Sequence, residues 1–186
     1  MQMAAWEVPT QQSEFDIPLK ADVRINDIAA VIVAGGNRAE LVPMRWSFPP
    51  PEGRKGGPVF NFRSEGRSFA NSRRCLVPAS AFFEFTTPDD PKQKRKDKWR
   101  FTRTDGWWMA IAGLWKPAEG NHPALFTLLT TDAGPDIAPI HTRQIIPLEP
   151  GDWRAWLSLS RPEAEILRPT PAGVLQVRKV EPAGLS

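Results

Sequence analysis

Proline constrains this chain more than any other residue type, because 20 of its 186 residues are proline and a further 13 are glycine. Proline lacks a backbone N–H and interrupts helices and central strands, so its abundance argues against a helical bundle. The hydrophobic share of 41% is nevertheless that of a globular protein with a real core. We therefore expect one α+β domain over residues 1–186 that is mostly β, with many turns and a few short helices.

Apolar and alternating runs separated by turn residues predict where the strands lie. The expected strands cover residues 29–34, 41–48, 75–85, 98–104, 107–115, 125–131 and 174–180, and short helices are expected over 149–159 and 162–167. Gly35-Gly36 predicts a hairpin between the first two strands, and Asp105-Gly106 predicts another between 98–104 and 107–115. This pattern is typical of a curled antiparallel sheet or an open, distorted barrel.

Several classes of protein are not expected from the composition. No apolar run approaches the roughly 20 residues of a membrane-spanning helix, so we expect no membrane partner. The first residues lack the basic start and apolar stretch of a signal peptide. Cys75 is the only cysteine, which excludes an intrachain disulfide and, with only two histidines in the chain, disfavours a zinc site. We expect a cytoplasmic protein without metal or cofactor.

The basic residues are unevenly distributed, although the net charge is only +3. Residues 53–74 and 92–103 together contain 13 of the 24 basic residues and 2 of the 21 acidic ones. In 53–74 the charges alternate with Asn, Ser and Phe, a mixture suited to phosphate contacts beside stacked bases. The 92–103 stretch fits equally well a solvated loop followed by the polar face of a strand. Such segregation predicts a local positive field.

Three polar residues lie where the hydrophobic pattern alone would not place them. Glu84 interrupts the apolar run AFFEF, where a buried carboxylate is costly unless it is paired or functional. His141 follows a strand in the segment APIHTR, and Asn61 opens NFRSEG. Each also has a plain structural interpretation, as an outward-facing strand residue, a structural donor or a turn residue. Cys75 fits an inert buried thiol, and no function is expected for His122 in its loop.

Six segments, taken in order, resemble motifs of the SOS response-associated peptidase (SRAP) family. They are MRWSFPPP at 44–51, NFRSEG at 61–66, RCLVPASAFFEF at 74–85, MAIAGLW at 109–115, TLLTTDAGPDIAPIHTR at 127–143 and WRAWLS at 153–158. NFRSEG is similar to the family's Asn-Ala-Arg-x-Glu motif, and MRWSFPPP to its Trp-Gly strand. Each segment alone is a weak signal, and their order gives the resemblance its weight over roughly residues 27–180.

The resemblance implies an α+β fold around a distorted β-barrel, a monomer with a positive groove for single-stranded DNA. Members of the family capture abasic sites: an N-terminal cysteine, freed by removal of the initiator methionine, attacks the sugar aldehyde and closes a thiazolidine ring. The family's peptidase and lyase activities are implied with it. By the same resemblance the catalytic residues are Asn61, Glu84 and His141. The residues implied for DNA binding are Trp46, Arg63, Arg67, Arg74 and Arg143.

The printed sequence departs from the family pattern at its start, which reads Met1-Gln2-Met3 with no cysteine behind the methionine. Cys75 offers no free α-amine and matches an internal family cysteine. One explanation is an incomplete N-terminus, which the presence of the full acid–base set favours. A second is a degenerate member that binds single-stranded DNA without covalent capture. A third hypothesis, independent of the resemblance, is a small β-rich hydrolase that uses Glu84 and His141.

Overall fold

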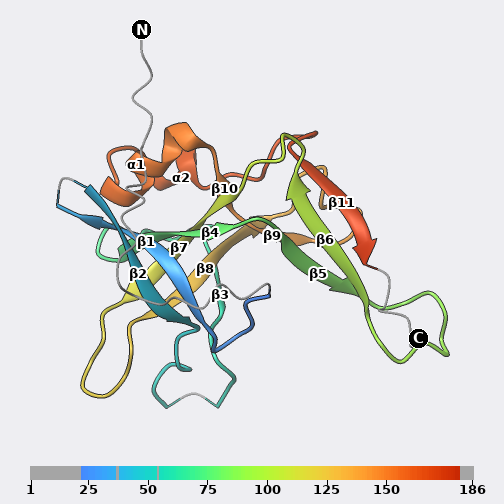
Figure 1. Cartoon of the computed structure of the whole chain (residues 1–186), viewed down its shortest axis with the longest axis horizontal. Coiled ribbons are helices and arrows are strands. Elements are labelled where there is room, and N and C mark those ends of the chain that lie inside the picture. The colour runs from blue at the N-terminus through green and yellow to red at the C-terminus, as the bar shows by residue number, and fades with distance from the viewer. Residues whose placement is uncertain (1–21, 37, 54, 181–186) are drawn as a thin grey trace, which may run out of the picture.

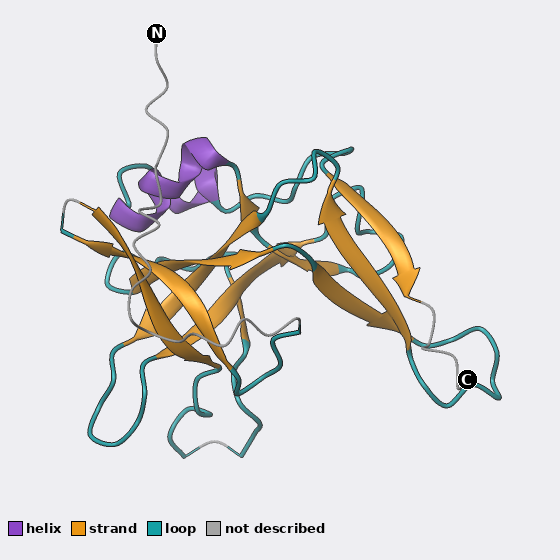
Figure 2. Ribbon diagram, viewed as in Figure 1, coloured by secondary structure: helices purple, strands orange, loops and turns teal. Residues whose placement is uncertain are grey.

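The structure, a computed structural model, describes residues 22–36, 38–53 and 55–180. Within them the chain forms a larger and a smaller β-sheet and two short helices (Figures 1 and 2). The larger sheet contains β1 (Ile28–Gly35), β2 (Arg38–Trp46), β3 (Asn61–Arg63), β4 (Arg73–Ala79), β7 (Met109–Lys116), β8 (Leu125–Asp132), β9 (Arg143–Ile145) and β10 (Pro147–Leu148). The smaller contains β5 (Phe82–Thr86), β6 (Asp97–Arg103) and β11 (Leu175–Val180). The helices are α1 (Pro150–Ser158) and α2 (Glu163–Ile166).

Five strands of the larger sheet close on themselves. β1 pairs with β2 and β4, β7 pairs with β4 and β8, and β2 pairs with β8. The β2–β8 contact is parallel whereas the other four are antiparallel, so the ring is a distorted barrel. This confirms the expected mostly-β fold, and closure protects the strand edges.

Alternate residues of β7 belong to two cores, which explains its nearly continuous apolar sequence. Met109 and Ile111 face the core that also contains Phe101 of β6, whereas Ala110 and Ala112 face the core formed with α1. Trp156 of α1 is fully buried in this second core, and its indole N–H donates a hydrogen bond of 3.0 Å to the Cys75 carbonyl. The helices thus cover one face of the barrel, as Figure 2 shows.

The smaller sheet was predicted incorrectly in two places. The run 75–85 is two strands in different sheets, β4 and β5, separated by Ser80 and Ala81. Both strands are apolar, so the hydrophobic pattern does not reveal that the chain passes from the larger sheet to the smaller one between them.

The expected hairpin at Asp105-Gly106 is also wrong, since β6 pairs with β5 and β11 rather than with β7. The Asp105 carboxylate accepts hydrogen bonds from the Arg103 guanidinium and from the Trp107 backbone N–H. Trp107 was expected in a buried strand, yet it is 69% exposed. This turn therefore redirects the chain from one sheet to the other.

The hairpin of β1 and β2, the positions of β8 and β11, and the helix α1 agree with expectation. The sequence did not predict β3, β9 or β10, because two or three residues are too few for alternation to register. None of the helices in the described residues is long and apolar enough to cross a membrane.

Candidate active site

Glu84 projects from β5 on the same sheet face as Trp99, its cross-strand partner on β6. The carboxylate is partly buried, and the loss of solvation raises its pKa above the ordinary value. The positive charge of His141 acts in the opposite direction and lowers the same pKa. The two side chains, 57 residues apart in sequence, therefore lie within electrostatic range of each other.

His141 is held by a tight turn between β8 and β9. The backbone N–H groups of Ala138 and His141 donate to the carbonyls of Gly134 and Ile137, both at 2.9 Å. The Asp136 carboxylate accepts the N–H groups of Gly173 and Leu175, each at 2.9 Å, and so joins the turn to β11. This turn is thereby fixed against the smaller sheet, where Glu84 lies.

The His141 ring is oriented by the backbone two residues further on. Its Nδ1 lies 2.8 Å from the Arg143 carbonyl oxygen and 3.1 Å from the Arg143 backbone nitrogen. The Nδ1 either donates to the carbonyl or accepts from the amide, depending on the tautomer. In both cases Nε2 is the nitrogen left for proton exchange.

Asn61 and Arg63 come from β3, which runs parallel to β8. Asn61 lies opposite Leu128 and Arg63 opposite Thr130, and both side chains are exposed. Because β9 flanks the other edge of β8, β3 lies about 10 Å from the strand that follows His141. No hydrogen bond joins Asn61 to Glu84 or His141 within the described residues.

The resemblance implies that Arg143 is free to bind a DNA phosphate, whereas in the structure its guanidinium is engaged by other side chains. Its guanidinium forms a bidentate pair with Glu65, in which Nη2 lies 2.8 Å from Oε2, and also donates to Asp132 at 2.8 Å and Thr130 at 3.1 Å. The contact with Arg143 lowers the pKa of Glu65 to about 2. Arg143 therefore connects the loop that follows β3 to β8 and β9. Sequence reasoning quoted Glu65 within NFRSEG without giving it this role.

Arg74 is likewise a structural residue here. It is partly buried and its Nη1 donates to the carbonyls of Phe69 and Ser72, at 2.9 and 3.0 Å. Burial lowers its pKa. The expected DNA contact would have to compete with these bonds. By contrast, the exposed Arg67 has its Cζ 4.5 Å from the centroid of the Phe62 ring, and its charge faces solvent.

Trp46 packs within the barrel end rather than standing free. Its ring is parallel to Phe126 at 6.3 Å and edge-on to Phe60 at the same distance, and its Nε1 donates to the Phe60 carbonyl at 3.0 Å. Phe60, 38% exposed and adjacent to Asn61, is the more accessible ring. The sequence did not reveal that the Phe60 ring is exposed whereas Trp46 is partly buried.

The structure also locates Cys75 and His122, two residues for which the sequence predicted no function. Cys75 is fully buried in β4, and burial raises the pKa of its thiol, which suits the inert role expected for it. His122 lines a surface pocket that is described below. Among the described residues, no group of three or more His, Cys, Asp or Glu side chains is arranged to hold a metal ion.

The fold is a small distorted β-barrel with a second sheet, and Glu84 of the smaller sheet lies within electrostatic range of His141. The family model for SOS response associated peptidases (SRAP) matches residues 2–183. The chain therefore belongs to the SRAP family, and this membership associates it with the response to DNA damage.

The named relatives are abasic site processing proteins. YoqW of Bacillus subtilis, an abasic site processing protein, is 29% identical over 150 residues, and the match covers 74% of this chain. The chain spans 66% of the length of YoqW. An abasic site processing protein of Saccharomyces cerevisiae is 31% identical over 91 residues, which cover 48% of this chain and 24% of the yeast protein.

Solved structures support the fold. A protein from Bordetella bronchiseptica is 27% identical with a TM-score of 0.67, and the match covers 87% of this chain and 88% of that one. A Bacteroides thetaiotaomicron protein, 18% identical with a TM-score of 0.62 over 84% of this chain and 75% of its own, shares the fold.

Proposed function

We propose that this chain binds single-stranded DNA and reacts with abasic sites, with Glu84 and His141 as the acid–base pair. The observation that carries the proposal is the partly buried Glu84 within range of the His141 charge. A raised carboxyl pKa keeps more of the acid protonated near neutral pH, which suits a group that must both give and take a proton. The names of the relatives supply the substrate, an abasic site.

The reaction we propose is addition of an amine to the open-chain sugar aldehyde. The nitrogen forms a bond to the aldehyde carbon and loses a proton, and the resulting carbinol loses water after protonation of its hydroxyl. The product is an iminium ion. If a thiol lies beside the amine, its sulfur adds to the same carbon as its proton leaves, and a thiazolidine closes. The sum is condensation with loss of one water and no change of oxidation state.

Glu84 and His141 are suited to the two proton transfers of this sequence. One removes the proton from the attacking nitrogen, and the other protonates the departing hydroxyl. Asn61, exposed at the start of β3, is a neutral donor and acceptor for the sugar oxygens. These roles rest on the family resemblance and on the placement of the three residues.

The nucleophile of this reaction is a terminal α-amine, and a cysteine at that terminus would add the thiol. Cys75 is unsuited because it is fully buried and its thiol pKa is raised. A lone thiol also adds to an aldehyde only reversibly.

DNA affinity in the proposal comes from exposed cations. Arg63 and Arg67 are exposed, and neither is engaged by a carboxylate within the described part of the chain. Cations of this kind bind phosphates irrespective of base sequence and make binding sensitive to salt.

The test is denaturing gel electrophoresis after incubation with an abasic single-stranded oligonucleotide. We compare the printed chain with a chain extended so that cysteine directly follows the initiator methionine. The extended chain is expected to give a heat-stable adduct and the printed chain none. If the extended chain forms no adduct but binds intact single strands in a salt-dependent way, the noncovalent alternative is correct. An adduct of the printed chain that disappears in Cys75→Ala would show that the nucleophile is assigned wrongly.

A further inference from the structure

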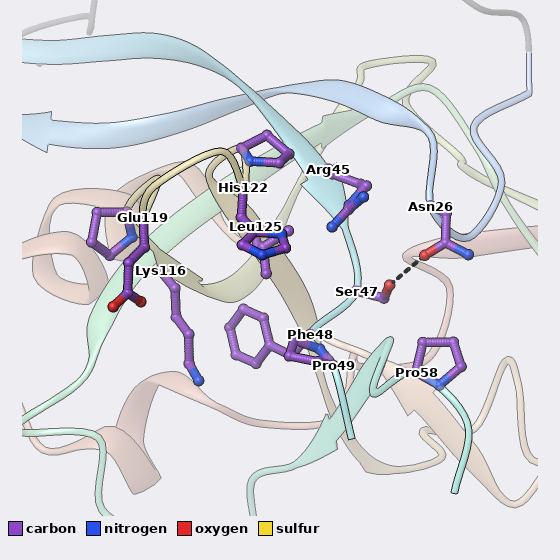
Figure 3. Close-up of a pocket in the computed structure, with 12 residues that line it drawn as sticks. Asn26, Arg45, Ser47, Phe48, Pro49, Pro58, Lys116, Glu119, His122 and Leu125 are labelled. Atoms are coloured by element: carbon purple, nitrogen blue, oxygen red, sulfur yellow. Dashed lines mark hydrogen bonds between the residues drawn. The ribbon is translucent and has the colours of Figure 1, made fainter. Parts of the chain in front are cut away.

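A pocket of about 450 Å³ lies between the β7–β8 hairpin and the segment that follows β2 (Figure 3). Its volume is that of a small-molecule site. Arg45 and Lys116 are the cationic side chains that line it among the described residues, together with His122 and the carboxylate of Glu119. Phe48 and the proline rings at 49, 58, 117 and 123 supply apolar walls.

Arg45 is the feature that calls for a ligand. It is half-buried at the end of β2, and its guanidinium has no hydrogen-bond or ion-pair partner among the residues that the structure describes. A partly desolvated guanidinium gains most from a charge-assisted, bidentate contact with an anionic oxygen. Lys116 contributes a second positive charge to the lining, on the other side of the Phe48 ring in the view of Figure 3.

The wall beneath Lys116 is aromatic. The Lys116 Nζ lies 5.0 Å from the centroid of the Phe48 ring, and Phe48 is fixed by backbone hydrogen bonds with Val59 of 2.8 and 3.0 Å. A ring held in place in this way offers a face for a planar group. A pocket that accepts both an anion and a planar group fits a nucleotide better than an isolated inorganic ion.

Two polar residues form one side of the pocket. The Ser47 hydroxyl donates to the Asn26 side-chain oxygen at 2.9 Å, and both residues line the pocket (Figure 3). Ser47 has a φ of 117° and Asn26 a φ of 74°. Non-glycine residues in this region are held there by their surroundings, so the amide has a defined position.

A short segment of the chain connects the pocket to the smaller sheet. Asp22 lies 3.3 Å from the Lys98 ammonium group, and Lys98 is next to Trp99, the strand partner of Glu84. Asn26, which lines the pocket, follows Asp22 by four residues, so this segment contacts both the smaller sheet and the pocket.

We propose that this pocket binds one nucleotide of the strand that flanks the abasic site, with its phosphate on Arg45 and its base against Phe48. The inference rests on the proposed function and adds a second anchoring point to it. It also predicts that binding strength depends on the length of DNA beside the lesion, because a short strand cannot fill the pocket.

The first experiment is an NMR titration of the ¹⁵N-labelled chain with thymidine monophosphate and, separately, with inorganic phosphate. Thymidine monophosphate should shift the amide signals of Phe48, Lys116 and His122, and inorganic phosphate should bind more weakly. Arg45→Ala should weaken nucleotide binding about tenfold, the loss expected for one charge-assisted contact. The matched control is Arg38→Ala at the other end of β2, where the Arg38 side chain is 77% exposed and pairs with Glu40. Equal binding of both ligands, or equal effects of both substitutions, overturns the assignment.

The second experiment measures affinity for single-stranded oligonucleotides of increasing length around one abasic site. Affinity should rise once the strand reaches the pocket, and Arg45→Ala or Lys116→Ala should abolish that rise and lower the salt slope by about one. Thermal melting checks that each variant is folded. A chain that reacts with abasic DNA but shows no rise, or a rise indifferent to Arg45→Ala, overturns the pocket alone. A chain that does not react, yet binds long strands through Arg45, overturns the proposed chemistry and supports the pocket.

Discussion

Arg143 and Glu65, 78 residues apart in the sequence, form a bidentate ion pair that joins the loop after β3 to β9. The guanidinium also binds Asp132 and Thr130 of β8, so one side chain joins β8, β9 and the loop that follows β3. Arg143 is only two residues from His141, whose ring contacts the Arg143 backbone. The pair therefore fixes the relation between the Asn61 strand and the histidine, which gives Arg143 a positioning role.

Replacing Glu65 with Gln should remove an acid-sensitive part of the stability. The folded-state pKa of Glu65 is about 2 against an ordinary 4.5, so its ionisation stabilises the fold above pH 4.5, and this contribution is lost as the pH falls toward 2. Denaturant melts of the wild type and Glu65→Gln should converge over that window. The exposed Glu52→Gln serves as the control and should leave the acid limb unchanged. Parallel curves for Glu65→Gln and the wild type would contradict the prediction.

Arg63 and Arg143 should respond differently to alanine substitution. Arg63→Ala is expected to leave the melting temperature unchanged and to lower the salt slope of DNA binding by about one, because an exposed phosphate contact is lost. Arg143→Ala should lower the free energy of unfolding by about 1–3 kcal/mol, since Glu65 and Asp132 lose their partner. Fluorescence anisotropy and thermal melting separate the two effects. A stable Arg143→Ala protein with reduced salt slope would restore the simple phosphate role.

Glu84→Gln and His141→Ala should each slow adduct formation by the cysteine-extended chain by about 10²-fold, the usual contribution of general acid–base catalysis. Affinity for intact single strands should change little, because neither side chain is needed for phosphate contact. Initial rates from gel time courses give the comparison. Unchanged rates in both variants would remove the acid–base assignment.

Gly134 should not tolerate a side chain. A Cβ at this position would lie 2.2 Å from the Thr170 carbonyl oxygen and 3.1 Å from the Gln144 side-chain oxygen, so the turn that carries His141 would have to move. We expect Gly134→Ala to cost about 2–4 kcal/mol of folding free energy. Gly151→Ala in α1, where no atom lies within 4 Å, should be neutral or slightly stabilising. Circular dichroism melts test the pair, and similar melting points would show that the turn accommodates the methyl group.

Cys75 should be unreactive in the folded protein. Its side chain is fully buried and its thiol pKa is raised, so a thiol reagent should label it only after denaturation. Adduct formation by the extended chain should persist in Cys75→Ala when each protein is assayed at the same interval below its own melting temperature. Rapid labelling under native conditions would indicate that β4 opens.

The sequence alone determined the fold class and the family. Dense proline, short apolar runs and six ordered motifs required a mostly-β chain, and the near-continuous apolar run in β7 followed from burial on both faces. Glu84 was identifiable because a carboxylate within AFFEF is costly without a partner. These are local properties, set by side-chain chemistry and spacing along the chain.

Only the tertiary structure decided which residues meet. The split of 75–85 between two sheets and the absence of a β6–β7 hairpin depend on long-range pairing that periodicity does not encode. The same holds for Arg143 and Arg74, whose charges looked available until their partners were known. A guanidinium in a sequence carries only its charge, whereas its freedom to bind DNA depends on which carboxylates and carbonyls the fold places beside it.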